Sequence, residues 1–528
     1  MFRIRKSFFP YPSLRHCKPQ GREVGGIGMK KLSELAALVK GAKMLGDDVD
    51  IAAITHDSRK VKKGTLFVAI PGEHVDGHKF IPQAAASGAV AVVSARDPKE
   101  IELPAGMTLL SVQNLREALD SIVPFFHDYP AEKMRIIGIT GTNGKTTTSY
   151  ITRAILRAAG YKVGLIGTIQ IMIEDETFEI HNTTPDVVEL QETLANMRDA
   201  GMDYVVMEVS SHALDQERVA GIEFDTAVFT NLTQDHLDYH KTLENYKRAK
   251  AKLFDHVSET GKKRGKTAVI NIDDTASKTM LAHAKCEHLT YAIEKKADLM
   301  ASDVHVHAAG MEMTLTHERF GARHIHLQIT GIFNVYNVMS AVGAALAEHI
   351  EPAVIERALT DFTSVPGRFE LVKTGAPFAI VVDYAHTPDG VKNVLETARK
   401  IAKKRIIAVF GCGGDRDKTK RPIMGRLAAE LADVVIATSD NPRTEPPQII
   451  LDEVEAGVEE KIAGKHHEKI IDRRKAIFRA AELAEEGDII AILGKGHEDY
   501  QILKDKTIHF DDREVAREAA AHVLEAKA

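Results

Sequence analysis

The chain has 528 residues, of which 44% are hydrophobic and 27% charged, and a formal net charge of −6. These values are typical of a soluble globular protein with about two to four domains. There is no basic excess of the kind that marks nucleic-acid binding, and no apolar run approaches the roughly 20 residues of a membrane helix. The three cysteines lie far apart without metal-ligand spacing, which argues against a disulfide framework or a zinc site and fits a reducing cytoplasm.

Residues 1–28 differ in composition from the rest of the chain. They hold six Arg or Lys and one acid, Glu23, without the apolar segment of a secretory signal. The composition also allows an organelle transit peptide. We expect instead a disordered, translated leader before a natural start at Met29, followed by a helix over 32–39.

Residues 29–133 read as a first small α/β unit. Apolar strand patterns alternate with polar turns, and Ser58 lies in one such turn beside Arg59. Taken from the residues alone, this is a strand, turn and strand arrangement with a polar loop. The pattern by itself assigns Ser58 no more than a turn role.

The most informative stretch is the glycine-rich run over 138–148. A buried strand is predicted over 134–139, and apolar residues at helical spacing follow the run. In a strand–turn–helix unit, glycines and the helix N-terminus cradle phosphate oxygens, while Lys145 reaches the β/γ-phosphates and Thr146 takes Mg²⁺. The first glycine of the standard pattern is replaced by Ile139, and the alternative is an ordinary glycine turn of an α/β protein.

The run T-G-T-N-G-K-T-T resembles the nucleotide loop of the Mur ligase family, relatives of folylpolyglutamate synthase that join an amino acid to a carboxylate using ATP. The resemblance implies three α/β domains. They are a small N-terminal domain for the uridine nucleotide (29–133), a central P-loop-type ATPase sheet (134–366) and a C-terminal Rossmann-like domain for the amino acid (367–528). ATP would be held by Gly141, Thr142, Asn143, Gly144, Lys145, Thr146 and Thr147.

Three further residues are candidate Mg²⁺ ligands beside Thr146. Glu208 ends a strand next to the phosphate loop, where a metal-binding carboxylate belongs. A Ser–His hydrolase is the competing interpretation of the following residues, but the chain lacks a G-x-S-x-G elbow. His236 follows another strand and comes directly after Asp235. From the residues alone, this pair could be a catalytic dyad, part of a metal site or an ordinary hydrogen-bonded loop. By the resemblance His236 holds Mg²⁺ and Lys250 is carbamylated, although Lys247 and Lys252 lie close in sequence.

The resemblance also assigns substrate and adenine contacts. Asn334 and Asn337 lie three apart on one predicted helix face, and side-chain amides can read adenine, although helix capping explains them equally well. Arg368 and Asp383 would face the nucleotide from the third domain. The predicted contacts to the UDP-linked substrate are Ser58, Thr183, Thr184, Ser210, Gln216 and Arg218.

In the third domain, strands predicted at 378–382, 405–410, 434–437 and 488–493 alternate with helices, which indicates a mostly parallel sheet. Each strand is followed by a polar loop, and ligands collect at such strand ends. Arg443 can grip a carboxylate while Asp440 or Glu498 takes an ammonium. Diaminopimelate-adding members of the family carry D-N-P-R here. The resemblance completes this pocket with Arg416, Asn441, Pro442, Gly494 and Glu498.

The expected activity is ATP-dependent addition of meso-diaminopimelate to the D-glutamate side chain of UDP-N-acetylmuramoyl-L-alanyl-D-glutamate, in peptidoglycan precursor synthesis. Lys145, Lys250 and His236 are the catalytic candidates. Addition of L-lysine, a folate ligase and a nucleotide-dependent switch are the alternatives. We expect small-molecule partners, a cytoplasmic monomer, and no nucleic acid or membrane insertion.

Overall fold

The computed structural model describes residues 28–71, 76–180, 182–258, 261–307 and 310–527. It divides into two compact units, Met1–Gln113 and Asn114–Ala528. Strands and helices alternate throughout, which confirms the predicted α/β class. The predicted leader lies outside the described residues except for Gly28. One large sheet lies within each of the three predicted domains, whose boundaries remain predictions.

The first unit contains a five-stranded sheet in the order β2-β7-β6-β5-β4. The strands β4 to β7 are parallel to their neighbours, whereas β2 is antiparallel to β7. The first helix, α1 (Leu32–Ala37), begins where the sequence predicted and ends two residues earlier. The strands are β2 (Lys43–Leu45), β4 (Ala53–Thr55), β5 (Thr65–Val68), β6 (Ala89–Ser94) and β7 (Thr108–Ser111).

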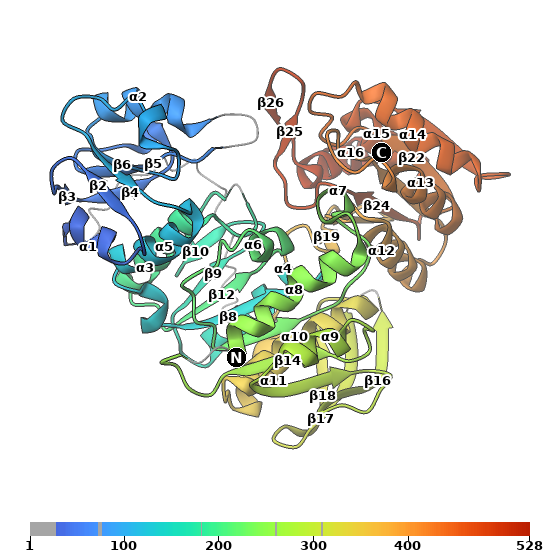
Figure 1. Cartoon of the computed structure of the whole chain (residues 1–528). Coiled ribbons are helices and arrows are strands. Elements are labelled where there is room, and N and C mark those ends of the chain that lie inside the picture. The colour runs from blue at the N-terminus through green and yellow to red at the C-terminus, as the bar shows by residue number, and fades with distance from the viewer. Residues whose placement is uncertain (1–27, 72–75, 181, 259–260, 308–309, 528) are drawn as a thin grey trace, which may run out of the picture. The chain divides into compact units, whose positions relative to one another are not determined.

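The second unit is built around an eleven-stranded sheet in the order β11-β10-β9-β12-β8-β13-β14-β15-β16-β17-β18 (Figure 1). The strands from β9 to β16 run parallel in this order, and both edges are antiparallel hairpins. The alternating sequence over 300–330 forms β16 to β18, as predicted. The bounds are β8 (Arg135–Thr140), β9 (Val163–Ile166), β10 (Ile171–Ile173), β11 (Glu176–Phe178), β12 (Tyr204–Glu208), β13 (Thr226–Phe229), β14 (Thr267–Asn271), β15 (Glu287–Ala292), β16 (Leu299–His307), β17 (Gly310–His317) and β18 (Gly321–Leu327).

Helices cover both faces of this sheet and form two separate apolar cores. One core joins the sheet to α4 (Lys145–Ala158), α10 (Ile332–Ala347) and α11 (Pro352–Asp361). The other joins it to α5 (Val187–Asp199), α8 (Leu243–Ser258) and α9 (Ser277–His283). Because β8 lies between β12 and β13, the ends of these two strands flank the phosphate loop.

A third sheet has six strands in the order β19-β20-β24-β21-β22-β23, of which only β19 is antiparallel to its neighbour. The four predicted strands are present within one residue of their expected ends. The edge strand β23 was not predicted, because its sequence, His-His-Glu-Lys-Ile, is polar and mostly exposed. The bounds are β19 (Glu370–Val372), β20 (Ala379–Asp383), β21 (Ile406–Phe410), β22 (Val434–Thr438), β23 (His466–Ile470) and β24 (Ile489–Leu493).

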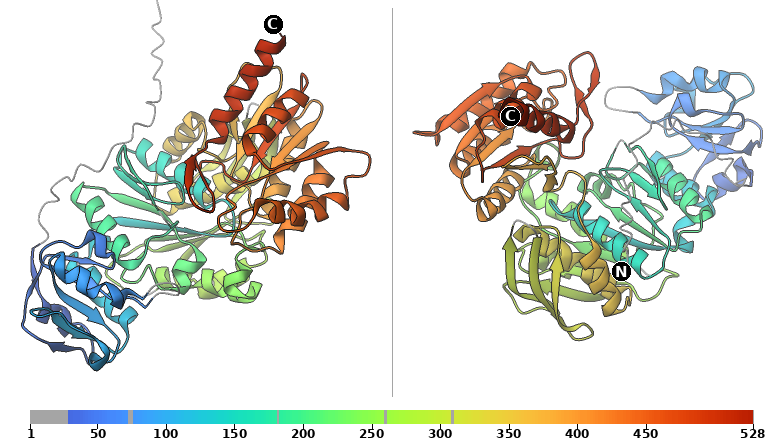
Figure 2. Two further views of the ribbon diagram at one scale, coloured as in Figure 1. Left: turned by 90° about the horizontal axis from the view of Figure 1, so that it is seen from above. Right: turned by 180° about the vertical axis from the view of Figure 1, so that it is seen from behind.

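Two layers of helices enclose the third sheet. One apolar core lies under α12 (Pro388–Ile401), α13 (Lys420–Leu431) and α14 (Pro447–Glu459). The other lies under α15 (Arg473–Leu483) and α16 (Asp512–Lys527), which is drawn in red in Figure 2. This is the doubly wound arrangement that the strand–helix alternation predicts.

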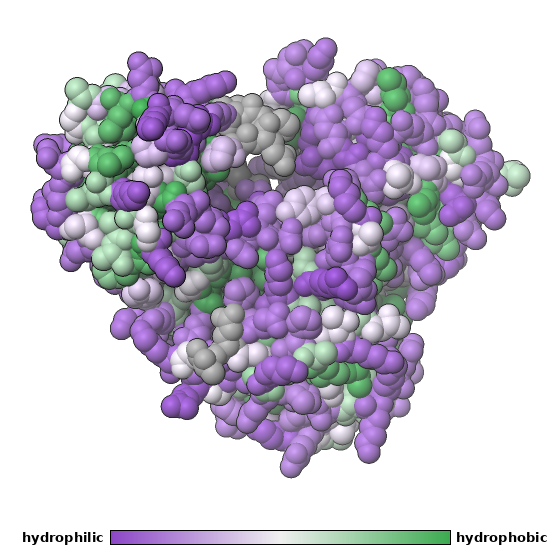
Figure 3. Space-filling model, viewed as in Figure 1, coloured by the Kyte–Doolittle hydropathy of each residue, from purple (hydrophilic) through white to green (hydrophobic). Residues whose placement is uncertain are grey.

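The displayed surface is mostly hydrophilic, and its hydrophobic side chains lie in small groups (Figure 3). The large exposed apolar residues are spread over the chain, for example Leu45, Leu243 and Leu371. Among the helices of the described residues, none has the length and hydropathy needed to cross a bilayer.

Candidate functional site

The loop between β8 and α4 has the close packing expected of a phosphate loop. Gly141 and Gly144 have φ of 152° and 87°, a region that side-chain-bearing residues rarely adopt. A Cβ on Gly141 would lie 1.9 Å from Thr230 Oγ1, and one on Gly144 would lie 2.1 Å from Asn337 Oδ1. Glycine is therefore required at both positions. The predicted contacts Thr146 and Thr147 are buried in the first turn of α4.

Lys145 is the first residue of α4 and turns back over the loop. Its ammonium donates hydrogen bonds of 2.9 Å to the carbonyl oxygens of Gly141 and Thr142. Burial lowers the pKa of Lys145, and the charges of Glu208 and Asp235 oppose this shift. Carbonyl oxygens carry only partial charge, so the ammonium lies at the loop without a bonded carboxylate to neutralise it, as a phosphate-binding group should.

Glu208, at the end of β12, is the centre of a buried polar network. One carboxylate oxygen accepts hydrogen bonds from the hydroxyls of Thr146 at 3.1 Å and Thr168 at 2.9 Å. The other accepts from the backbone N–H of Thr168 at 2.9 Å. The predicted pair Glu208 and Thr146 is thus brought together as a set of oxygen donors, which suits Mg²⁺. Thr168 was missed, because it lies on a short turn after β9 that has no motif.

The loop after β13 forms the other wall of the phosphate loop. The side chain of Asn231 accepts from the backbone N–H of Asn143 at 2.9 Å, and Thr230 Oγ1 donates to the carbonyl of Asn143 at 2.7 Å. His236 follows, with its Nε2 3.4 Å from Asp235. Burial lowers the pKa of His236 despite this carboxylate. Its imidazole is therefore neutral at pH 7, the form that binds a metal.

Lys250 is the buried lysine of α8. Its Nζ donates to the carbonyl of Gly141 at 2.8 Å and lies 4.4 Å from the centre of the Tyr246 ring. Burial lowers the pKa of Lys250 well below its usual value, and Lys145 adds to the effect. By contrast, Lys247 pairs with Glu244 and Lys252 with Asp215, at 2.7 and 3.4 Å. Of the three lysines, only Lys250 reaches the phosphate loop in these contacts.

Four of the residues predicted to bind the UDP-linked substrate are joined in one chain of contacts. Thr184 Oγ1 donates to the backbone carbonyl of Glu208 at 2.9 Å and accepts from the N–H of Ser210 at 3.0 Å. Arg218 donates to the Thr184 carbonyl at 3.0 Å and to Gln216 Oε1 at 2.7 Å.

The fifth residue, Thr183, has its hydroxyl 3.1 Å from that of Thr168. Ser210 also caps α6 (Ser211–Asp215). The structure therefore places all five next to the Glu208 network.

The two amide residues of α10 lie behind the loop. Asn337 Nδ2 donates to Asn334 Oδ1 at 2.9 Å, and Asn334 Nδ2 donates to the Thr330 carbonyl at 2.7 Å. Both side chains are buried, and Asn337 packs against Gly144. Their position on one helix face is as predicted, and in this structure their amides bond to each other.

Arg368 and Asp383 have different surroundings. Arg368 donates to Thr146 Oγ1 at 3.0 Å and lies 4.5 Å from the centre of the Tyr384 ring, so it reaches the phosphate loop. The Asp383 carboxylate accepts from the backbone N–H groups of Phe369 and Ala385, at 2.6 and 2.7 Å. Burial raises the pKa of Asp383. In this structure Asp383 fixes the loop that carries Arg368.

The loops after β21, β22 and β24 bring the predicted amino-acid pocket together. A Cβ on Gly413 would lie 2.9 Å from Arg443 Nη1 and 3.7 Å from Arg416 Cγ, so both arginines flank this glycine. Arg443 donates to the carbonyls of Gly414 and Asn441, at 3.0 and 3.4 Å. Arg416 donates to the Asp415 carbonyl at 2.9 Å. Two guanidinium groups thus lie close together with carbonyl partners.

The acidic side of this pocket is already bonded. Glu498 accepts from Asn441 Nδ2 and from Lys495 Nζ, both at 2.8 Å. Asp440 accepts from the backbone N–H of Asn441 at 2.6 Å. Gly494, with φ of 117°, approaches Asp440 so closely that a Cβ would lie 2.4 Å from Oδ2. Pro442 is buried between Asn441 and Arg443.

Two supporting residues were missed by sequence reasoning. Lys495, just discussed, is fully buried beside Glu498. Arg473 binds Asp512 through two hydrogen bonds of 2.7 Å and donates to the carbonyls of Ser439 and Leu493, at the ends of β22 and β24. Basic residues in G-K-G and D-R-R contexts offer no signal that separates them from surface charge.

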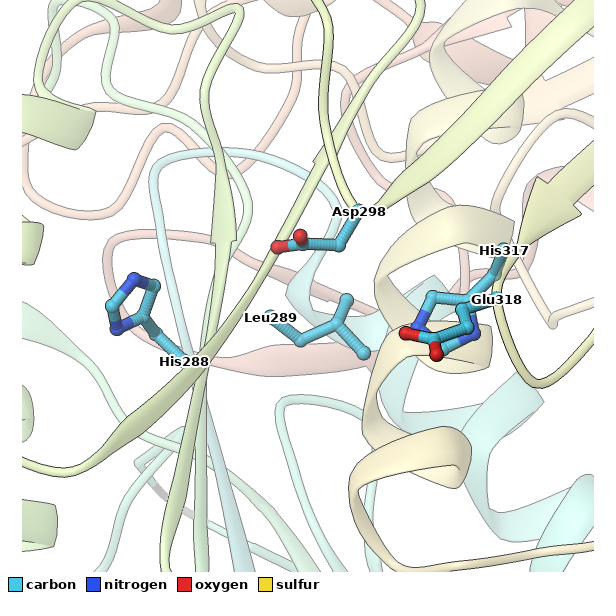
Figure 4. Close-up of a pocket in the computed structure, with 5 residues that line it drawn as sticks. All are labelled: His288, Leu289, Asp298, His317 and Glu318. Carbon is cyan, nitrogen blue, oxygen red and sulfur yellow. The ribbon is translucent and has the colours of Figure 1, made fainter.

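Ser58 lies in the first unit, on the single-turn helix Ser58–Lys60, and its hydroxyl is 3.3 Å from Gln83 Oε1. One cavity, of about 250 Å³, lies between β15, β16 and β17 and is lined by His288, Leu289, Asp298, His317 and Glu318 (Figure 4). None of the predicted site residues lines it. The polar constellation at the strand ends, rather than this cavity, is therefore the candidate site.

Comparisons with known proteins identify the family of the chain. The sequence patterns of the Mur ligase middle domain, the Mur ligase glutamate ligase domain and the Mur ligase family catalytic domain match residues 139–345, 367–496 and 50–127.

A Clostridium botulinum protein named UDP-N-acetylmuramoyl-L-alanyl-D-glutamate--2,6-diaminopimelate ligase is 47% identical over 89% of this chain and 95% of its own. A Bacillus cereus protein of the same name is 48% identical over 90% and 94%.

A solved structure of a protein with this name is also similar, with 33% identity and a TM-score of 0.63, covering 91% of this chain and 96% of its own. The nearly full-length identity and the three matched domains lead to one conclusion. The chain belongs to the Mur ligase family of ATP-dependent, amide-forming ligases.

Proposed function

We propose that the chain adds meso-2,6-diaminopimelate to the D-glutamate side-chain carboxylate of UDP-N-acetylmuramoyl-L-alanyl-D-glutamate, using ATP, in peptidoglycan precursor synthesis. The single observation that carries this choice of amino acid is Arg443. Its guanidinium lies at the end of β22 with carbonyl partners, next to Arg416. The far end of diaminopimelate bears a carboxylate as well as an ammonium, and this carboxylate offers Arg443 a charged, bidentate partner. The names of the relatives support the same choice.

L-lysine lacks the second carboxylate and would leave the guanidinium without a charged partner. Leaving a desolvated charge unpaired costs several kcal/mol, enough for roughly 10³-fold discrimination. The ammonium of the same end would lie toward Asp440 and Glu498. Because Glu498 already bonds Lys495 and Asn441, Asp440 is the freer acceptor of the two.

The proposed chemistry has two steps. The D-glutamate carboxylate oxygen attacks the γ-phosphorus of ATP, and the bond from that phosphorus to the bridging oxygen breaks. ADP departs, and the substrate becomes an acyl phosphate. The neutral amine of diaminopimelate then attacks the carbonyl carbon, and the tetrahedral adduct expels phosphate as the amine loses its proton. A carboxylate is a poor electrophile and phosphate a good leaving group, which is why ATP is required.

Positive side chains at the phosphate loop are suited to the first step. Lys145 and Arg368 would offset charge that builds up on the transferred phosphoryl group. Glu208, Thr146 and His236 present two kinds of oxygen and a neutral imidazole, which fit a Mg²⁺ ion. Bound there, Mg²⁺ supplies charge neutralisation at the phosphates.

Lys250 has the chemistry for carbamylation. A neutral buried amine attacks CO₂, forms an N–C bond and releases a proton, which converts the side chain into a carboxylate-like group. The lowered pKa of Lys250 favours the neutral amine that this reaction needs. The carbamate would add an oxygen ligand for a second Mg²⁺ beside Gly141.

Phosphate release tests the proposal. Purified protein is given ATP, Mg²⁺ and UDP-N-acetylmuramoyl-L-alanyl-D-glutamate, with either meso-diaminopimelate or L-lysine. We expect sustained release with diaminopimelate alone. Equal release with lysine would still show a ligase but would contradict the role of Arg443 in choosing the amino acid. Release with neither amino acid would overturn the substrate assignment. We also propose that the reaction takes place in the cytoplasm and that the protein is a monomer, and sedimentation would check the oligomeric state.

A further inference from the structure

The outer face of β16, β17 and β18 carries a histidine–glutamate cluster that the ligase reaction does not use. His324 and His326 are two residues apart on β18, so their side chains share one face. Glu312 lies opposite His326 in the β17–β18 register. His305, two residues from His307, lies opposite Glu312 in the β16–β17 register. The strands β16, β17 and β18 are neighbours at one edge of the sheet (Figure 1). Histidines of β16 and β18 thus lie near the Glu312 carboxylate of β17.

The distances in this cluster match those between metal ligands. His326 Nδ1 lies 3.3 Å and His307 Nε2 3.8 Å from Glu312 Oε1, and His324 Nε2 lies 3.5 Å from Oε2. The ligand atoms of Glu312, His324 and His326 all lie within 4.8 Å of one another. Nitrogen and oxygen ligands about 2.0–2.1 Å from a tetrahedral metal are roughly 3.4 Å apart.

A plain ion pair explains the arrangement less well. An imidazole that donates to a carboxylate lies about 2.7–3.2 Å from it. His466 and Glu468, two residues apart on β23, show such a pair at 2.7 Å. All three distances to Glu312 are longer, and three imidazoles surround one carboxylate.

We propose that Glu312, His324 and His326 bind one divalent ion of the zinc class and tie β17 and β18 together. Imidazole nitrogen with a single carboxylate favours Zn²⁺, Co²⁺ or Ni²⁺ over Mg²⁺ or Ca²⁺. The site would fasten the edge strand to the sheet, since β18 has β17 as its neighbour on one side only. Its role is structural, and it does not depend on the ligase activity.

The test measures zinc binding by the full-length protein. Chelator-treated protein is titrated with zinc chloride against a chromogenic zinc chelator, with Mg²⁺ and ADP present to occupy the region around Glu208. The double variant His324→Gln/His326→Gln is compared with wild type. His466→Gln is the matched control, because it removes an exposed strand histidine that faces a single carboxylate.

We expect wild type and His466→Gln to bind one more equivalent of zinc than the double variant, or to bind it at least about tenfold more tightly. Zinc should raise the thermal unfolding midpoint of wild type more than that of the double variant. Unfolding midpoints without zinc check that the double variant folds, and Glu312→Gln replaces it if they differ. Equal stoichiometry and affinity in wild type and variant, or no zinc binding by wild type, would overturn the site.

Discussion

The phosphate-loop region and the loops of the third sheet differ in how their charged side chains are bonded. At the phosphate loop, Lys145 and Lys250 are buried against carbonyl oxygens, and the carboxylate of Glu208 bonds hydroxyls and a backbone N–H rather than either lysine. In the third sheet most charges are already paired, as in Arg473–Asp512 and Lys495–Glu498.

Arg416 and Arg443 differ from these pairs, because their hydrogen bonds described above go to carbonyls. Each region therefore keeps positive charge that its own residues do not neutralise. At the phosphate loop this charge comes from the ammonium of Lys145, which suits a triphosphate. In the third sheet it comes from guanidinium forks, which suit a carboxylate held in one orientation. On the proposed function, the first region would carry out phosphoryl transfer and the second would select the amino acid.

The largest expected effect is at the phosphate loop. Lys250→Ala should lower the rate of product formation by about 10³-fold, or roughly 4 kcal/mol of transition-state stabilisation, because it removes the carbamate that would hold a second Mg²⁺. Lys247→Ala, which changes a half-buried lysine of the same helix that pairs with Glu244, is the control and should stay near wild type.

Intact-mass measurement in bicarbonate checks the modification. Wild type should gain the mass of CO₂, and Lys250→Ala should not. A variant with wild-type activity would exclude Lys250 from the reaction.

The matching change in the third sheet is Arg443→Lys. A single ammonium cannot bond both oxygens of a carboxylate as a guanidinium fork does. The KM for diaminopimelate should rise by about 10²-fold or more, while the KM for ATP stays within about twofold. Arg426→Lys, at an exposed arginine of α13, is the control. Equal increases in both KM values would mean that the two regions are not separate.

A smaller effect is expected from Thr168→Val, which removes one hydroxyl donor to Glu208 and keeps the shape of the side chain. Losing a hydrogen bond to a charged group costs about 1.5 kcal/mol, so kcat/KM should fall about tenfold and the Mg²⁺ requirement should rise. Thr177→Val, on the exposed β11, should change neither quantity. A stability loss without a change in Mg²⁺ dependence would make Thr168 purely structural.

The smallest expected effect is on stability, and it comes from the partly buried carboxyl group of Asp120, which lies outside both regions. Burial raises the pKa of Asp120 on α3 (Leu115–Phe126) to about 7, with Glu217 adding to the shift. The folded state therefore holds its proton between about pH 4 and 7, where the unfolded state has lost it. This contribution to stability is present at low pH, is lost as pH rises towards 7, and stays constant above that.

Asp120→Asn should accordingly raise the free energy of unfolding at pH 8 by on the order of 1 kcal/mol, after allowance for solvent screening, and change it little at pH 4. Urea unfolding at both pH values measures this difference. Asp361→Asn, at an exposed helix end, is the control. The same change at both pH values would rule out protonation of Asp120 as the cause.

Most of the fold, and the clustering of many candidate site residues, could be predicted from the sequence, because parallel strands place their polar loops at one edge of a sheet. The β8–α4 unit and the four strands of the third sheet follow directly from apolar runs and glycines. Position within a helix was harder to predict: Lys247, Lys250 and Lys252 look alike in sequence, and only tertiary packing buries Lys250.

Partners from distant segments were not predictable. Thr168 and Lys495 contribute through contacts with residues that their local sequence does not indicate. Asp383 was predicted to face the nucleotide, and the sequence did not indicate that its carboxylate would also accept from the backbone N–H groups of Phe369 and Ala385. The role of each predicted site residue stays a prediction until the variants are measured.

The most direct test of the division between the two regions is isotope exchange within ATP. ATP labelled with an oxygen isotope at the β–γ bridge is incubated with Mg²⁺ and UDP-N-acetylmuramoyl-L-alanyl-D-glutamate, without an amino acid. If acyl phosphate forms at the phosphate loop alone, the label should move to non-bridging β positions in wild type and equally in Arg443→Lys, but not in Lys250→Ala. Exchange that requires diaminopimelate, or that is lost in Arg443→Lys, would contradict the separation of phosphoryl transfer from amino-acid binding.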